Sequence, residues 1–291
     1  MAFIIKLGGT CTDTTLDTLE RDRLLSGDSN GVRFLFDAEF PFCYAGGAPA
    51  NGAVIADIAE NANGTFVKDA TQTIAFNGNG FDFSAMTAST GSLSLSRNNV
   101  SGPASVWADI DAQQHFLWCA YMRIPSLSDW NTNAVILPFF ASSIGAATGY
   151  QSAIDPLTMN FHNTPAIQAR RQTSVGVATT MSASPALHYG LVSQVAFWRN
   201  AVECGLRVKS AGGSTLVTAA SGSDNSADIS SSVPQWGSVN PFTSYTLSEH
   251  RTGRNYRMYR GFIENLHTSS RDPVEVLDAD YTRTIGRAVF S

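Results

Sequence analysis

The sequence predicts an all-β protein: an antiparallel two-sheet sandwich or jelly roll that ends in one short helix. Only 15% of the 291 residues are charged and 24 are Gly, which is typical of short strands joined by turns. Candidate strands recur along the whole chain, with turn sequences between them. Heptads, long amphipathic helices and internal repeats are not found in the sequence. These observations together favour a layered β fold.

The most informative stretch is HFLWCAYMRIP, residues 115–125. It is rich in aromatic and apolar side chains and closes at Pro125, as expected of a strand. Trp118 belongs to a fully apolar face at period two, while the face that carries Tyr121 is only partly polar. A strand that is apolar on both faces lies within a sheet and has layers above and below it. We therefore expect a central core strand here.

Residues 1–30 are predicted to form a separate segment, with residues 31–291 as the β domain. A short strand is predicted at residues 3–7 and a marginal amphipathic helix at residues 13–25. Two interpretations of the segment stay open. It is either an arm that docks onto another subunit or a terminal strand that pairs within its own sheet.

The remaining elements follow from turn and strand patterns. Residues 74–83, IAFNGNGFDF, predict a tight Asn-Gly hairpin. Asp272, Pro273 and Glu275 match the first turn of a capped helix that extends to about Asp280. Further strands are expected at residues 32–42, 134–141, 157–161, 166–170, 189–199, 205–209, 215–218, 257–267 and 284–290, with polar loops at 126–133 and 221–232.

The order of these elements resembles the concanavalin A-like lectin/laminin G-like jelly roll. The hairpin at 74–83 and the long strand at 115–125 resemble two consecutive elements of that family. The strand and Gly-tipped hairpin at 190–217, and YRGFIENL at 259–266 before the capped helix, resemble its later elements. The resemblance covers about residues 31–291 and implies the fold, whereas the ligand varies widely among proteins of this fold.

The sequence offers no convincing catalytic centre. Three carboxylate pairs have the spacing of an acid and base on one strand face, namely Asp37/Glu39, Asp109/Asp111 and Asp278/Asp280. The Glu-x-Asp-x-(x)-Glu pattern of the glucanases with this fold is absent, and so are G-x-S-x-G, HExxH and a phosphate loop. We therefore expect a non-enzymatic protein without a cofactor.

Two groups of polar residues offer possible ligand sites, but a structural role is the better interpretation of each. Asp224, Asn225 and Asp228 share a Gly- and Ser-containing loop and offer oxygen atoms to calcium, but a polar loop without metal is the better interpretation. Arg251, Arg254, Arg257 and Arg260 recur every third residue beside two tyrosines. They are interpreted as solvated side chains, with a polar interface or a site for acidic sugars as the alternative.

Carbohydrate binding is the most specific site hypothesis. Pyranose rings stack on exposed aromatic side chains that have amide and carboxylate groups beside them. Asp129, Trp130 and Asn131 supply this set within one predicted loop, and Trp236 is a second candidate. The alternative for each tryptophan is an indole that covers one end of the sandwich.

The composition limits the kinds of partner that the protein is expected to bind. The net charge is −5, which gives no argument for a nucleic-acid partner, and no apolar run is long enough for a membrane span. The N-terminus lacks the pattern of a signal peptide, and the scattered cysteines are expected to be free, mostly buried thiols.

The Ser-, Ala- and Asn-rich composition resembles that of bacteriophage virion proteins with such jelly rolls. We therefore expect a virion protein that is assembled in the host cytoplasm and serves as capsid decoration or as part of the tail. It is expected to contact other virion subunits, to form a symmetric homo-oligomer and to adhere to host surface glycans. The alternative is a free carbohydrate-binding module or glycoside hydrolase of the same fold.

Overall fold

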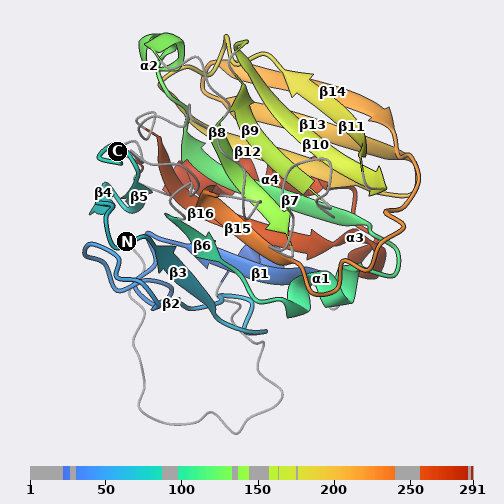
Figure 1. Ribbon diagram of the computed structural model, residues 1–291, viewed down its shortest axis with the longest axis horizontal. Coiled ribbons are helices and arrows are strands. Elements are labelled where there is room, and N and C mark those ends of the chain that lie inside the picture. The colour runs from blue at the N-terminus through green and yellow to red at the C-terminus, as the bar shows by residue number, and fades with distance from the viewer. Residues whose placement is uncertain are drawn as a thin grey trace, which may run out of the picture.

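The computed structural model describes residues 22–26, 31–86, 98–132, 137–143, 157–162, 164–174, 176–239, 256–287 and 290. These residues form two antiparallel β-sheets that pack face to face (Figure 1). Sheet A has eight strands in the order β14-β13-β12-β7-β16-β5-β4, with β1 also paired to β16. Sheet B has eight strands in the order β11-β10-β9-β8-β15-β6-β3-β2. The predicted all-β, two-sheet jelly-roll sandwich is confirmed.

Sheet A consists of β1 (Val32–Asp37), β4 (Ala75–Asn77), β5 (Gly80–Asp82), β7 (Phe116–Arg123), β12 (Val192–Arg199), β13 (Glu203–Ser210), β14 (Gly213–Ala220) and β16 (Arg257–Asn265). Sheet B consists of β2 (Ala53–Ile55), β3 (Gly64–Lys68), β6 (Asn98–Ser101), β8 (Leu137–Ser143), β9 (Leu157–His162), β10 (Ala166–Ser174), β11 (Val177–Ala183) and β15 (Val233–Ser238). The helices are the 3-10 helix η1 (Arg23–Leu25) and the α-helices α1 (Ser105–Ile110), α2 (Leu127–Thr132), α3 (Leu266–Ser269) and α4 (Pro273–Arg287).

The central strand of sheet A is β7, as the sequence predicts. It pairs with β12 on one side and with β16 on the other. Trp118 points toward sheet B, where its ring centroid lies 4.4 Å from that of Phe140 and 6.4 Å from that of Trp236. Tyr121 points the other way and donates a hydrogen bond of 2.7 Å to Asp280 of α4. Layers on both faces explain why this strand is apolar on both.

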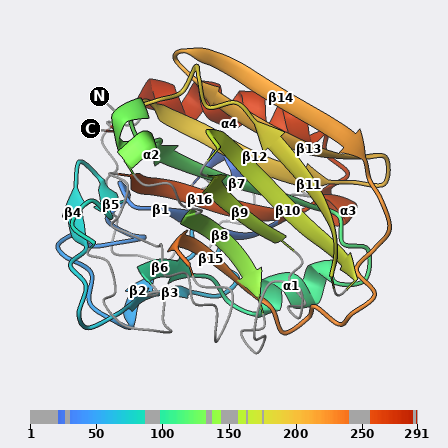
Figure 2. The same cartoon turned by 45° about the horizontal axis from the view of Figure 1, so that its top comes forward.

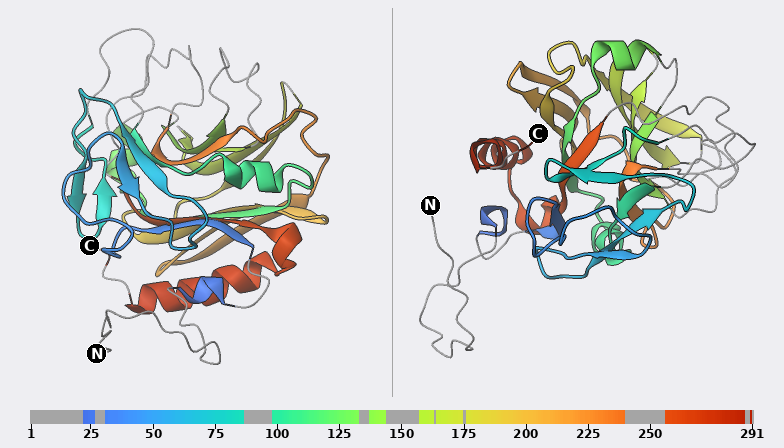
Figure 3. Two further views of the ribbon diagram at one scale, coloured as in Figure 1. Left: turned by 90° about the horizontal axis from the view of Figure 1, so that it is seen from below. Right: turned by 90° about the vertical axis from the view of Figure 1, so that its left-hand side faces the viewer.

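Helix α4 covers the outer face of sheet A and lies next to η1 (Figure 3). It begins as predicted, because the Asp272 carboxylate accepts the backbone N–H groups of Val274 and Glu275 at 2.8 and 2.9 Å. The helix is longer than predicted and continues through Arg287, so the strand expected at 284–290 is wrong. The physical reason is helical periodicity, which places Leu277, Asp280 and Thr284 on one buried face.

The Asn-Gly hairpin is confirmed at β4 and β5, where Gly78 and Asn79 both adopt positive φ, at 52° and 62°. This is the geometry of a type I′ turn, which matches the twist of the paired strands. Two expectations need correction. The strand predicted at 32–42 ends at Asp37, and the polar loop predicted at 126–133 contains helix α2. Helices α1 and α3 and strands β2, β3, β6, β11 and β15 were not predicted.

The expected state of the cysteines is confirmed within the described part of the chain. Cys43, Cys119 and Cys204 are free and buried. No helix of the described residues is long and apolar enough to cross a membrane. Most of segment 1–30 lies outside the described residues, so its proposed role stays a prediction, although residues 23–25 form the 3-10 turn η1 rather than an α-helix.

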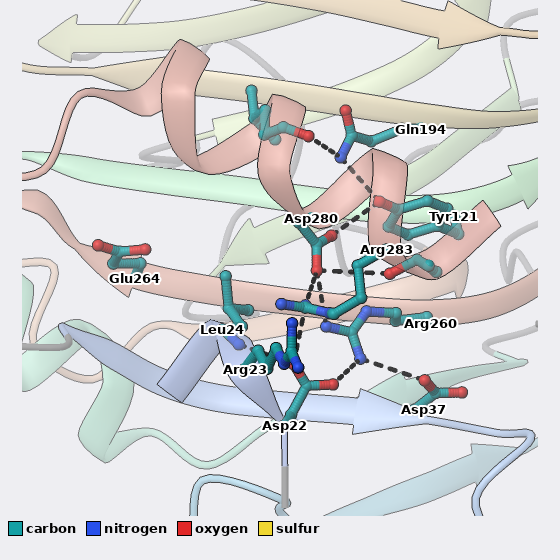
Figure 4. A network of polar contacts seen from close by, with 12 residues as sticks. Asp22, Arg23, Leu24, Asp37, Tyr121, Gln194, Arg260, Glu264, Asp280 and Arg283 are labelled. Atoms are coloured by element: carbon teal, nitrogen blue, oxygen red, sulfur yellow. Dashed lines mark hydrogen bonds and ion pairs between the residues drawn. The ribbon is translucent and has the colours of Figure 1, made fainter. Parts of the chain in front are cut away.

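A buried ion network fixes α4 and η1 to sheet A (Figure 4). Arg260 of β16 is fully buried, and its guanidinium group binds Asp22 at 2.8 Å, Asp37 at 3.1 Å and Asp280 at 2.9 Å. Arg283 of α4 binds Asp22 and Asp280 at 2.8 and 2.5 Å. Because each carboxylate faces at least one guanidinium group, the network is tolerated in the interior, and each carboxylate comes from a different part of the chain.

The attachment of η1 is expected to depend on pH. Burial alone raises the pKa of the Asp22 carboxyl, but Arg260, the Leu24 N–H and Arg283 outweigh it and hold the pKa below its usual 3.8. A carboxyl group whose pKa is lower in the folded protein than in the unfolded chain stabilises the fold. This contribution is complete above the pKa of the unfolded chain and is lost as the pH falls through the pKa of the folded protein. We therefore expect the Leu24 and Leu25 amides to lose hydrogen-exchange protection below about pH 4. In Asp22→Asn they should be weakly protected already at neutral pH; equal protection in both proteins would contradict this role.

Candidate functional site: the polar face of sheet B

The two faces of sheet B differ sharply in polarity. Paired residues on adjacent strands share a face, so the register defines rows that cross the sheet. One row is entirely apolar and faces sheet A. It runs Met181, Ala169, Met159, Phe140, Trp236, Val100, Phe66 and Ala53. This row forms one side of the core.

The alternating row lies on the outer face and is mostly polar. It runs Thr180, Arg170, Thr158, Ala141, Gln235, Ser101 and Thr65. A second row on the same face aligns Ser182, Gln168 and Asn160. We call Ser101, Thr158, Asn160, Gln168, Arg170 and Gln235 the polar face. Adjacent strands lie about 4.8 Å apart, so this face offers a regular array of hydrogen-bonding groups.

The polar face has a buried centre and an accessible border. Asn160 and Thr158 are buried, whereas Gln168, Arg170 and Gln235 are half-buried. The Asn160 Oδ1 atom has no hydrogen-bond partner among the described residues, although the side chain is only 4% exposed. Buried polar groups are normally satisfied, but this oxygen atom is itself buried, so the groups that a ligand can reach are the amides and the guanidinium group at the border of the face.

The charged residues in the strands of sheet B are all basic. None of the eight strands of sheet B contains Asp or Glu. Glycoside hydrolysis needs a pair of carboxyl groups that flank the scissile bond. Arg170 adds a positive charge to the outer face, which suits neutral or acidic ligands rather than cationic ones. The strands of this face can hold a polar ligand but cannot supply an acid and a base.

The predicted aromatic platform at Trp130 is not formed. Trp130 lies on α2, is 1% exposed and donates its indole N–H to the His162 carbonyl at 2.9 Å. Its ring packs edge-on against Phe161 and Tyr189, with centroids 5.0 and 5.6 Å apart. Because the ring is enclosed, no sugar can stack on it, and the expectation of an exposed platform is wrong.

The polar neighbours of Trp130 have a local role in the helix. The Ser126 hydroxyl accepts the Asp129 N–H at 3.2 Å and donates to the Asp129 carboxylate at 2.7 Å, which caps the start of α2. Asn131 lies on α2, but its side chain is outside the described part. Whether Asp129 or Asn131 contacts a glycan therefore stays a prediction.

Trp236 is also a core residue rather than a platform. It is fully buried in the apolar row of sheet B, and its indole N–H donates to the Cys119 carbonyl of β7 at 3.3 Å. Its ring packs on Phe34, Phe36 and Phe140, with centroids 5.4–5.6 Å apart. The hydrogen bond and the ring contacts join the two sheets, so the sugar-stacking role expected for Trp236 is wrong.

The carboxylates that matched acid–base spacing serve structural roles. Asp37 is bound to Arg260, and Asp109 is bound to Arg33 at 2.6 Å. Asp278 and Asp280 lie on α4, where the Asp278 carboxylate accepts bonds from β13 and Asp280 belongs to the buried network. Cationic partners thus hold four of the six carboxylates as ion pairs.

The arginine series and the polar loop also have internal partners. Arg257 binds Asp82 at 3.0 Å and Arg260 is fully buried, so the solvated role expected for Arg260 is wrong. Arg251 and Arg254 lie outside the described residues. Asp224 binds Arg199 at 2.6 Å. Within the described part of the chain, no cluster of side chains suits a metal ion.

The comparisons with known proteins show the fold alone. No protein-family profile matches the chain, and no curated protein matches its sequence significantly. The binding domain of botulinum neurotoxin serotype G is similar in structure, with a TM-score of 0.50 and 9% identity over 82% of this chain and 51% of that domain. This chain therefore spans about half of that domain.

Two further structures are similar at lower scores. Lectin II from Ulex europaeus has a TM-score of 0.42 and 14% identity, covering 80% of this chain and 98% of the lectin. The CBM2 module of an evolved Dit protein from Lactobacillus casei BL23 phage J-1 has a TM-score of 0.42 and 9% identity, covering 81% of this chain and 96% of the module. The described residues themselves form a two-sheet jelly-roll sandwich.

Proposed function

We propose that this protein is a non-enzymatic glycan-binding protein that uses the polar face of sheet B. The observation that carries the proposal is the alignment of amide, hydroxyl and guanidinium groups on neighbouring strands. Sugar hydroxyls both donate and accept hydrogen bonds, and amide side chains match both roles. The lack of carboxylates in the strands of this sheet supports binding without turnover.

The biological setting we propose is a bacteriophage virion, in the capsid or the tail, where the protein holds the particle to host surface glycans. This part rests on the Ser-, Ala- and Asn-rich composition and on the resemblance to jelly rolls of virion proteins. Mass spectrometry of purified particles tests it directly. The protein is expected among the stoichiometric components, and its absence from intact particles would overturn the virion assignment while leaving glycan binding open.

Glycan binding is tested with variants of the accessible amides. Gln168→Ala and Gln235→Ala each remove one half-buried amide from the polar face. A lost hydrogen bond costs about 0.5–1.5 kcal/mol, so each variant should weaken binding by up to about tenfold on an array of neutral and acidic glycans. The unfolding midpoint of each variant should stay close to that of the native protein.

The matched control is Thr282→Ala, which changes an exposed polar residue of α4 on the far side of sheet A. It should bind glycans as the native protein does. Equal binding by all variants would place the site elsewhere, and release of reducing sugar from a bound glycan would favour a hydrolase instead.

A further inference from the structure

The edges of the two sheets are protected to very different degrees. Sheet A ends in β14 on one side and in β1 and β4 on the other, and sheet B ends in β11 and β2. An edge strand presents unpaired N–H and C=O groups that can pair with another strand. Proteins prevent such pairing with short strands, charged residues, bulges or a covering loop.

Four of these edge strands carry such protection. Strands β2 and β4 have three residues each. Strand β11 pairs with β10 through a register shift between Gln172 and Ser174. Strand β1 is covered by a loop, because the Leu35 N–H donates to the Asp57 carboxylate at 2.9 Å and the Ile58 N–H donates to the Leu35 carbonyl at 2.9 Å.

Strand β14 has none of these devices. Its eight residues, Gly213–Ala220, pair with β13 in an unbroken register and include no charged residue and no proline. No described residue outside β13 forms a backbone hydrogen bond with it. The strand lies at the margin of the molecule in Figures 1 and 2. Leu216, near its middle, is 50% exposed.

We propose that β14 pairs antiparallel with β14 of a second copy of this chain, so that sheet A continues across a two-fold symmetric dimer. In such a dimer the same surface meets itself, and like charges would face each other if the strand carried any. With the axis perpendicular to the sheet, Leu216 meets Ser214, Leu216 or Thr218 of the second copy. All of these are neutral. Strand β14 is therefore compatible with itself as a partner.

The experiment compares the native chain with single substitutions of β14 by size-exclusion chromatography with light scattering. The native protein is expected at twice the chain mass of 31.1 kDa. Leu216→Glu and Thr218→Lys each introduce a charged side chain at the shared edge, a device that prevents strand pairing in natural sheets, and each should return the protein to the chain mass. Glu at 216 lies opposite Arg207 and Lys at 218 lies opposite Gly205, so neither creates repulsion within the monomer.

The matched control is Val177→Lys, which adds a charge to the other long edge strand at a residue that is 57% exposed. It should remain dimeric. A native protein that is monomeric at its highest soluble concentration overturns the proposal, and so do dimeric β14 variants or a monomeric Val177→Lys. Hydrogen exchange gives a second measurement: the β14 amides that point away from β13 should be protected in the native dimer and exchange in Thr218→Lys.

Discussion

Replacement of Arg260 by Met is expected to lower the free energy of unfolding by about 3–5 kcal/mol, because it removes the buried guanidinium group that forms ion pairs with three buried carboxylates. Asp37 is 1% exposed, Asp22 is 8% exposed and Asp280 is 1% exposed, so water cannot replace the guanidinium group. Arg283 still binds Asp22 and Asp280, whereas the ion pair between Arg260 and Asp37 is lost. Urea denaturation followed by tryptophan fluorescence measures the loss.

Two further variants separate charge from geometry. Arg260→Lys keeps the positive charge but replaces the planar fork by a single ammonium, which cannot reach three carboxylates from different elements at once. It should therefore remain clearly less stable than the native protein. Arg257→Met removes an ion pair whose arginine side chain is 21% exposed, and it should cost about 1 kcal/mol or less. If Arg257→Met and Arg260→Met lost the same free energy of unfolding, the burial of the Arg260 network would make no extra contribution to stability.

Local patterns were sufficient for most of the fold. The hairpin at residues 75–82 follows from its Asn-Gly turn, and the start of α4 follows from Asp272 and Pro273. The central position of β7 follows from its two apolar faces. The turn and the helix start depend on residues that are close together in the chain, and the position of β7 depends on which faces of the strand are apolar. These features can therefore be predicted from the sequence alone.

The environment of the tryptophans could not be predicted in the same way. Trp130 and Trp236 stand among polar or turn-forming residues in the sequence, which suggested exposure. Their burial depends on partners far along the chain, such as the His162 carbonyl for Trp130 and the Cys119 carbonyl for Trp236. The cap formed by Ser126 and Asp129 was a local pattern that would have indicated helix α2.

The polar face could have been found from the sequence. In β9, Thr158 and Asn160 alternate with Met159 and Phe161, and β10 repeats this alternation. Such alternation indicates one face toward the core and one away from it. What the sequence could not supply is the register, which aligns Asn160 with Gln168 and makes isolated polar residues into one surface. The partners of Arg260 were likewise hidden, because they come from three distant elements.

Replacement of Trp236 by Ala is expected to cost about 3–5 kcal/mol, which is typical when a large buried aromatic side chain is removed from a core. The indole ring is fully buried among aromatic rings from both sheets. The variant also leaves the Cys119 carbonyl without the indole N–H that bridges β15 and β7. Denaturant titration should show a lower midpoint, and Trp236→Phe, which keeps most of the ring volume, should lose much less.

The same variant distinguishes a core residue from a sugar platform. A platform residue loses glycan binding while the unfolding midpoint stays unchanged, because an exposed ring contributes little to folding. A core residue loses stability, while the fraction of molecules that remains folded still binds through Gln168 and Gln235. We therefore expect Trp236→Ala, measured at low temperature where it is folded, to bind glycans with native affinity. Native stability combined with lost binding would instead restore Trp236 to the binding site and contradict its place in the apolar row of sheet B.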